Sequence, residues 1–224
     1  MSAPSPAPKR RRIRGRTLFL AIVGLLIAIV VPTIVLPTLV FRKPAPQLDD
    51  YGELPPFSLT THTGQPITRD QLLGHVTIVD FIFTRCDTLC PLLSARMTRI
   101  QELTADVGKV VKLASFTVDP EHDTPEVLAS YAKSFGADEG RWVFITGDSA
   151  EVRRTIEQGL MAGYDTSGTL ASGAPNINHS GHFILLDKDA HIRGVYHHED
   201  ATKVDAMLRH ARWLSRQPRL PTPP

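Results

Sequence analysis

The chain has 224 residues, with 25 Lys and Arg against 23 Asp and Glu and a formal net charge of +2. Residues 1–43 hold 8 of the basic residues and no acidic one, which leaves 17 basic against 23 acidic residues, a net charge of −6, in the rest. That larger part lacks the positive excess by which proteins bind phosphate backbones, so we expect no nucleic-acid partner.

A basic cluster and an uncharged apolar segment form the N-terminal part of the chain. Residues 1–16 carry six Lys and Arg, and no charged residue occurs from Thr17 to Phe41. About 25 residues of helix at ~1.5 Å per residue exceed the roughly 30 Å hydrocarbon thickness of a bilayer. We therefore predict a single transmembrane helix over residues 17–41. A cleaved secretory signal is the alternative, but the segment is longer than such a signal's apolar core and offers no Ala-x-Ala site.

The distribution of charge predicts the orientation of this segment. Six basic residues precede it, and only Arg42 and Lys43 follow, so residues 1–16 are expected in the cytoplasm and the rest outside it. No segment typical of a transit peptide precedes the span. We therefore expect a bacterial inner membrane, with the soluble part facing the periplasm or the cell exterior.

The exported part is predicted to be a linker (residues 42–48), one folded domain (residues 49–216) and a proline-rich disordered tail (residues 217–224). Within the domain, apolar runs and turn residues predict alternating strands and helices. The expected elements are a hairpin over 57–60 and 64–68, strands at 75–83, 110–118 and 141–146, helices at 88–103, 124–135 and 149–161, a loop over 163–178, a hairpin of 182–187 with 191–196, and a last helix at 201–215. This order is typical of an α/β, thioredoxin-like domain with a central mixed sheet.

The chain has two cysteines, Cys86 and Cys90, which follow the expected strand at 75–83. A structural disulfide is one interpretation, but a bridge over three intervening residues removes little entropy from the unfolded chain. Positions i and i+4 share one face of a helix, so the two sulfurs can instead bind one metal ion or act as a redox pair. We expect this pair near solvent, at a helix N-terminus that favours the thiolate.

A metal ion at this pair would need further ligands. Zinc normally takes four, and no second cysteine pair exists, whereas two thiolates with one imidazole suit copper better. Among nine histidines, His179 is favoured because it precedes the strand expected beside the cysteine turn. His182 is a second candidate. The pair His197–His198 could bind a metal ion weakly, but it is expected in a solvated turn at the far end of the hairpin. The remaining histidines have no supporting context: His62, His75, His122, His191 and His210.

Four segments, taken in order, resemble the motifs of the Sco/SenC family over about residues 50–213. They are Phe83-Thr-Arg-Cys-Asp-Thr-Leu-Cys-Pro91, Phe116-Thr-Val-Asp-Pro-Glu-His-Asp-Thr-Pro125, Trp142-Val-Phe-Ile-Thr-Gly147, and His179-Ser180 followed by Phe183-Ile-Leu-Leu-Asp187. The resemblance implies a thioredoxin-like, membrane-anchored copper chaperone that delivers copper to the CuA site of a cytochrome c oxidase subunit. It also implies an upstream copper donor and a thiol reductant as further partners.

Carried over to this chain, the resemblance implies that Cys86, Cys90 and His179 bind the copper ion. Asp119, in the Val-Asp-Pro motif, is expected to have a structural role where the strand turns into the next loop. Asp87 departs from the family pattern, which often has proline directly after the first cysteine. A carboxylate there should raise the pKa of the two thiols and could attract a cation.

The main alternative is an enzyme, a thiol–disulfide oxidoreductase that reduces cysteines of the oxidase subunit or of other exported proteins. Cys86 would then attack and Cys90 would resolve the mixed disulfide, and His179 would be dispensable. A thiol peroxidase shares the fold, but it needs a lone cysteine of low pKa, which a close pair fits poorly. A purely structural exported domain is the remaining alternative.

Overall fold

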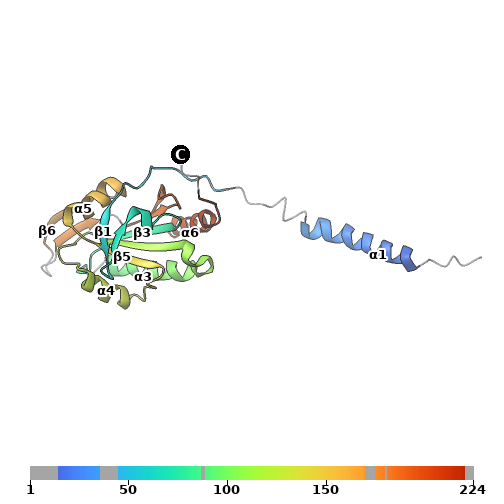
Figure 1. Ribbon diagram of the computed structural model, residues 1–224, viewed down its shortest axis with the longest axis horizontal. Coiled ribbons are helices and arrows are strands. Elements are labelled where there is room, and N and C mark those ends of the chain that lie inside the picture. The colour runs from blue at the N-terminus through green and yellow to red at the C-terminus, as the bar shows by residue number, and fades with distance from the viewer. Residues whose placement is uncertain (1–14, 36–44, 87–88, 170–174, 180, 220–224) are drawn as a thin grey trace, which may run out of the picture. The chain divides into compact units, whose positions relative to one another are not determined.

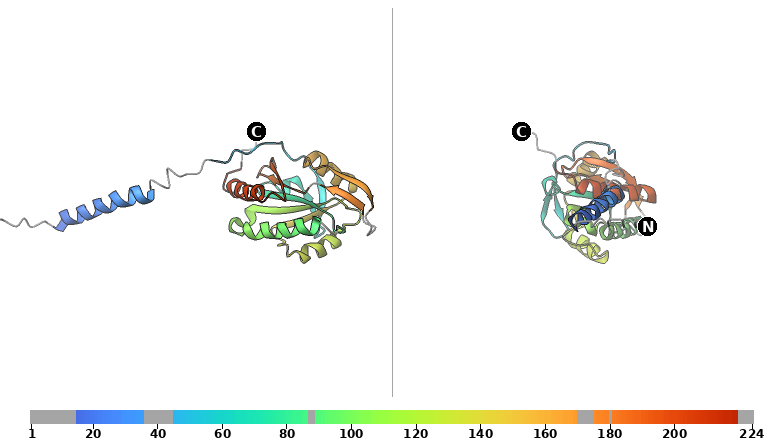
Figure 2. Two further views of the ribbon diagram at one scale, coloured as in Figure 1. Left: turned by 180° about the vertical axis from the view of Figure 1, so that it is seen from behind. Right: turned by 90° about the vertical axis from the view of Figure 1, so that its right-hand side faces the viewer.

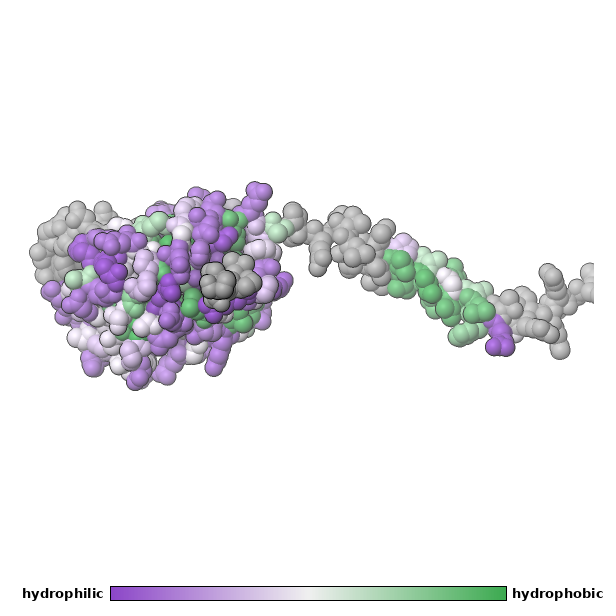
Figure 3. Space-filling model, turned by 45° about the horizontal axis from the view of Figure 1, so that its top comes forward, coloured by the Kyte–Doolittle hydropathy of each residue, from purple (hydrophilic) through white to green (hydrophobic). Residues whose placement is uncertain are grey.

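The computed structural model describes residues 15–35, 45–86, 89–169, 175–179 and 181–219 (Figure 1). The chain divides into two compact units, Met1–Ala45 and Pro46–Pro224. In the first unit, helix α1 (Gly15–Val30) is followed by a π-helical turn, Val31–Val35. Figure 3 shows that the surface of α1 is largely hydrophobic, whereas the visible face of the second unit is mostly hydrophilic.

Among the described residues, no helix combines the length and the hydropathy needed to cross a membrane. Helix α1 has 16 residues, about 24 Å of helix against a hydrocarbon thickness of roughly 30 Å. The predicted transmembrane helix over residues 17–41 is therefore not found in that form, because the regular α-helix ends at Val30. Residues 36–41 of the prediction lie outside the described part of the chain, as do residues 1–14 and 220–224.

The second unit is built on a seven-stranded mixed sheet with the strand order β2-β1-β5-β4-β3-β8-β9. The central strands β3, β4 and β5 are parallel, and the strands on both sides of them are antiparallel to their neighbours. This confirms the predicted α/β, thioredoxin-like domain with a central mixed sheet. The strands are β1 (Ser58–Thr61), β2 (Pro66–Thr68), β3 (Val76–Ile82), β4 (Val111–Thr117), β5 (Trp142–Thr146), β8 (His182–Leu186) and β9 (Ile192–His197).

Helices α3 (Leu89–Leu103), α4 (Pro125–Ser134) and α6 (Ala201–Ser215) lie next to one another. The Ser94 hydroxyl of α3 lies 2.9 Å from the Tyr131 hydroxyl of α4, and the guanidinium of Arg212 in α6 donates to the Leu103 carbonyl at the end of α3. The short helix α5 (Ser149–Arg154) continues into a π-helical segment, Thr155–Gly159. Figures 1 and 2 show α3 and α4 on one side of the sheet and α5 on the other.

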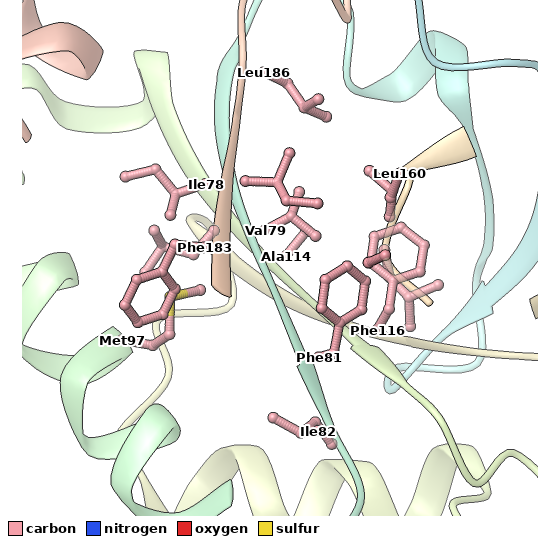
Figure 4. Close-up of a cluster of buried hydrophobic side chains, with 14 of the residues drawn as sticks. Ile78, Val79, Phe81, Ile82, Met97, Ala114, Phe116, Leu160, Phe183 and Leu186 are labelled. Atoms are coloured by element: carbon pink, nitrogen blue, oxygen red, sulfur yellow. The ribbon is translucent and has the colours of Figure 1, made fainter. Parts of the chain in front are cut away.

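Strand β3 is the centre of the core, and all seven of its residues are buried. Its side chains alternate between the two faces of the sheet. Figure 4 shows Ile78 toward Met97 of α3 and Phe183 of β8, while Phe81 lies with Phe116 on the opposite face. A strand buried on both faces reads as a continuous apolar run, which is why the sequence predicted it within one residue at each end.

Two predicted segments differ from the structure. The helix expected over 149–161 is regular only to Arg154, and Met161, which has a positive φ of 52°, lies beyond the π-helical segment. The loop expected over 163–178 contains two strands, β6 (Tyr164–Thr169) and β7 (Pro175–His179), which pair with each other in a separate two-stranded sheet. These strands lack apolar alternation because they do not pair with the main sheet over the core.

The strand register brings distant segments to one end of the sheet. Strand β8 runs antiparallel to β3 with Val79 opposite Ile184, so the first residue of β8 lies beside the last residues of β3. Strand β9 runs antiparallel to β8 and ends with His197 opposite His182. The connection from β3 to α3, the start of β8 and the end of β9 therefore share one end of the sheet.

Candidate metal centre

The cysteine pair lies in the connection from β3 to α3. Cys90 is the second residue of α3 and is fully buried, and Cys86 is 8% exposed. The backbone N–H of Cys90 donates to the sulfur of Cys86 at 3.5 Å, and the backbone N–H of Phe83 donates to the sulfur of Cys90 at 3.4 Å. No disulfide links the two residues. The expected juxtaposition of the two side chains is confirmed, but the expectation that the pair lies near solvent is wrong.

The environment of Cys90 favours the thiol over the thiolate. Its hydrogen bond with the Cys86 side chain, together with burial, raises the pKa of the Cys90 thiol far above its ordinary value. This is opposite to the effect expected from the helix N-terminus, because the loss of solvent and the neighbouring sulfur outweigh the helix dipole and the Phe83 N–H. A cation would therefore have to displace a proton from Cys90 in order to bind it. Asp87, whose carboxylate was expected to raise the pKa of the two thiols, lies outside the described residues.

A buried carboxylate on the β4–α4 connection holds the residues before Cys86. Asp123 has no exposed surface, and its carboxylate accepts hydrogen bonds from the Thr84 N–H at 3.2 Å, the Thr84 hydroxyl at 2.5 Å and the Thr117 hydroxyl at 2.5 Å. Burial raises the pKa of this carboxyl, although the three hydrogen bonds act in the opposite direction. Asp123 thus joins the end of β4 to the start of the cysteine-bearing segment.

A second acidic residue of the same connection binds the next residue of that segment. Nε and Nη2 of Arg85 both donate to Oδ2 of Asp119, at 3.0 and 2.6 Å, and the Asp119 carboxylate is nearly buried. The Asp119 carbonyl also accepts the N–H groups of His122 and Asp123 in the turn after β4. The structural role expected for Asp119 is therefore confirmed, and the structure adds that this residue fixes the arginine directly before Cys86.

A third carboxylate lies deeper, on β3. Asp80 is fully buried, and its Oδ1 accepts a hydrogen bond from the Ser115 hydroxyl at 2.5 Å, which in turn accepts from Nε1 of Trp142 at 2.9 Å. Its negative charge contributes to the raised pKa of Cys90. Sequence reasoning assigned no role to Asp80, Arg85 or Asp123. For Asp80, the sequence offered one signal of a special role: it is a charged residue inside an otherwise apolar strand, and a buried charge needs partners.

The predicted histidine ligand is placed only by its backbone. His179 is the last residue of β7 and pairs with Tyr164, and its side chain lies outside the described part of the structure. It is three residues from His182, so their Cα atoms are at most ~11 Å apart. Since His182 lies at the end of the sheet from which the cysteine segment leaves, the backbone of His179 is near that end. Within the described residues, no group of three His, Cys, Asp or Glu side chains is arranged to hold a metal ion.

The structure corrects the place assigned to His197 and His198. They were expected in a solvated turn at the far end of the terminal hairpin, but the turn lies at 187–191, and the antiparallel register returns β9 to the start of β8. His198 is buried, with only 4% of its surface exposed. Both residues therefore lie at the same end of the sheet as the cysteine segment.

Comparisons with known proteins agree with this arrangement. The SCO1/SenC family model matches residues 46–215. The chain is 30% identical over 156 residues to the SCO1 protein homolog of Bacillus subtilis, covering 70% of this chain and 79% of that protein. The chain is also similar to the solved structure of BsSco, with a TM-score of 0.66 and 27% identity over 77% of this chain and 100% of that one. BsSco is described as a member of the Sco family of cytochrome c oxidase assembly proteins, and a disulfide switch was identified in it. Arabidopsis thaliana ScoI with copper bound has a TM-score of 0.61 at 25% identity, covering 72% and 99%.

Proposed function

We propose, since this chain belongs to the SCO1/SenC family, that it binds one copper ion and delivers it to the CuA site of a cytochrome c oxidase subunit during assembly. The thiolates of Cys86 and Cys90 and the imidazole of His179 would be the ligands. The observation that carries the proposal is the pair of adjacent cysteine side chains in the β3–α3 connection. Copper-bound ScoI of Arabidopsis and the assembly role of the family of BsSco support it.

The geometry of the pair suits a soft ion that is later given up. Two thiolates select copper over harder cations, and three protein ligands leave the coordination shell open to a ligand of the acceptor. Because the site is nearly closed to water and Cys90 holds its proton firmly, binding would be coupled to proton release and would weaken at low pH. The contacts of Asp119 and Asp123 would keep the two sulfurs in place through loading and release.

The oxidation state of the pair would control loading, because a disulfide has no thiolate to offer. The same residues favour a second function, reduction of disulfides in the oxidase subunit or in other exported proteins. Cys86 is 8% exposed and Cys90 is fully buried, so Cys86 would attack the target disulfide and Cys90 would resolve the mixed disulfide. A thiol reductant would then have to restore the dithiol.

Copper stoichiometry of the reduced chain in detergent tests the ligand assignment. Under anaerobic dialysis we expect the wild-type chain to retain one copper ion more than the Cys86→Ser, Cys90→Ser variant, and His179→Ala to retain that ion more weakly. His122→Ala is the matched control, because His122 is exposed on the neighbouring connection and should leave copper binding unchanged. Equal copper in the wild type and in the double serine variant would exclude the proposal. Unchanged copper binding in His179→Ala would remove His179 from the ligand set, whereas loss of copper with dithiol exchange intact would support copper delivery.

We further propose that the uncharged segment 17–41 attaches the chain to a bacterial cytoplasmic membrane, with the second unit facing the periplasm or the cell exterior. Exposed apolar side chains along α1 and the six basic residues before Thr17 support this proposal. Fractionation of cells would test it: the chain should stay with the membranes in alkaline carbonate, and a variant that starts at residue 46 should not. Extraction of the whole chain by carbonate would contradict it.

A further inference from the structure

Three histidines gather at the end of the sheet where β8 begins and β9 ends. His182 and His197 are directly opposite each other in the strand register, with ring centres 4.9 Å apart and ring planes at 84°. The ring of His198 lies 4.9 Å from that of His197 at 35°. Neither the fold nor the proposed copper site at the cysteines requires three imidazoles here.

The innermost ring holds the arrangement in place. His198 is buried, and its Nδ1 lies 2.8 Å from the Gly181 carbonyl. A Cβ atom at position 181 would lie within 3.0 Å of two atoms of that ring, so the absence of a side chain at Gly181 makes room for it. The ring of His197 therefore packs against the fixed imidazole of His198, while the His197 side chain itself is 42% exposed.

The outer two rings offer nitrogen atoms that the rest of the described chain does not use. Within the described residues, no hydrogen bond reaches either ring nitrogen of His182, and the only one at His197 is from the Glu199 N–H to its Nδ1, at 3.3 Å. His182 is half-buried and His197 is partly exposed, so an ion could reach both from solvent. Nε2 of His197 and the ring of His182 are thus available as ligands.

We infer that His182 and His197 form a second metal site, for a borderline divalent cation such as Cu²⁺, separate from the cysteine pair. A metal–imidazole bond of about 2.0–2.1 Å places two ring centres roughly 4.5–5.2 Å apart for bond angles between about 90° and 109°. The observed 4.9 Å falls inside this range. Imidazole is a preferred ligand of copper, zinc and nickel, and Cu²⁺ binds most tightly among the divalent ions.

The site has two protein ligands, and this small number determines how readily the bound ion exchanges. No third His, Cys, Asp or Glu of the described chain completes a cluster there. Water or a ligand from another molecule fills the remaining positions, so the ion exchanges readily. The inference stands whether or not Cys86 and Cys90 bind copper.

The test uses the whole chain in detergent with Cys86→Ser and Cys90→Ser, so that thiolates cannot bind or reduce the added ion. Titration with copper sulfate should give one bound Cu²⁺, and pulsed electron paramagnetic resonance should detect two coordinated imidazoles. His182→Gln and His197→Gln should each weaken binding by roughly 10-fold or more, since losing a ligand costs at least as much as losing an outer-shell partner. His75→Gln is the matched control, because this half-buried histidine directly precedes β3, at the opposite end of that strand.

Two outcomes would overturn the inference. One is a spectrum of the unmodified histidines with fewer than two coordinated imidazoles, a readout that does not depend on whether any histidine variant folds. The other is unchanged Cu²⁺ affinity in His197→Gln; a loss in His179→Gln alongside it would assign the second ligand to His179 instead. Because the cysteines are absent throughout, neither outcome bears on the proposed thiolate site, whose failure would be seen only in the wild-type chain.

Discussion

Replacing Asp123 with alanine should destabilise the second unit without touching either sulfur. The change leaves the half-buried Thr84 N–H without its acceptor and removes two hydroxyl hydrogen bonds. An unpaired buried N–H costs about 1–3 kcal/mol, and a hydrogen bond to a charged group contributes about 1.5–3 kcal/mol. Part of this loss of stability is offset, because the substitution also removes the unfavourable burial of the carboxylate, which its raised pKa indicates. We therefore expect a net loss of about 3 kcal/mol.

For a domain of this size, about 1 kcal/mol lowers the melting temperature by roughly 2–4 °C, so Asp123→Ala should melt about 6–12 °C below wild type. Thermal unfolding followed by circular dichroism measures this. Asp205→Ala is the matched control, because Asp205 is exposed on α6 and its loss should cost less than about 0.5 kcal/mol. The double variant with Thr84→Val should lose less than the sum of the single losses. A melting temperature of Asp123→Ala within about 1 °C of wild type would refute the reasoning.

Three further predictions follow from the same contacts. Arg85→Met should lower the free energy of unfolding by about 1–3 kcal/mol in urea, because it leaves the nearly buried Asp119 carboxylate without its cation; an unchanged urea midpoint would contradict this. Burial raises the pKa of Asp123 above its ordinary value of 3.8. This group therefore contributes most to stability below about pH 3.8, and the contribution is lost as the pH rises through the pKa of the folded state. The difference in free energy of unfolding between wild type and Asp123→Asn should accordingly shrink from acid to neutral pH. Alkylation of the reduced chain by iodoacetamide should modify Cys86 before Cys90, because only Cys86 has exposed surface; mass spectrometry of peptides would reveal the reverse order if the burial were otherwise.

The regular elements of the second unit were predictable because local sequence and tertiary packing agree. The last helix was predicted over 201–215 and is found as Ala201–Ser215, with the Asp200 side chain accepting from the Lys203 N–H as its N-cap. The helix after Thr124 was predicted from a cap residue followed by proline, and the Thr124 side chain does cap α4. Such signals act within one turn of helix, so they can be read from a single sequence.

The candidate site was predictable only where its members are close in sequence. The spacing of Cys86 and Cys90 revealed the pair. The hydrogen bond between the two side chains and burial both raise the pKa of Cys90, and that burial depends on α3 and the sheet folding over it. The partners of Thr84 and Arg85 are more than 30 residues away, and strand pairing alone brings them there. His197 was misplaced for a related reason, since the direction of a hairpin was recognised but not the register that returns its second strand to His182.

The carboxylates of Asp119 and Asp123, on the β4–α4 connection, hold the residues directly before Cys86 through hydrogen bonds and an ion pair. A genetic screen for chains that have lost the proposed copper delivery should therefore recover substitutions between Thr117 and Asp123 as well as at the cysteines. Those variants would keep every proposed ligand and still fail. In this protein, an intact set of donor atoms is a poor guide to whether a sequence variant is harmless.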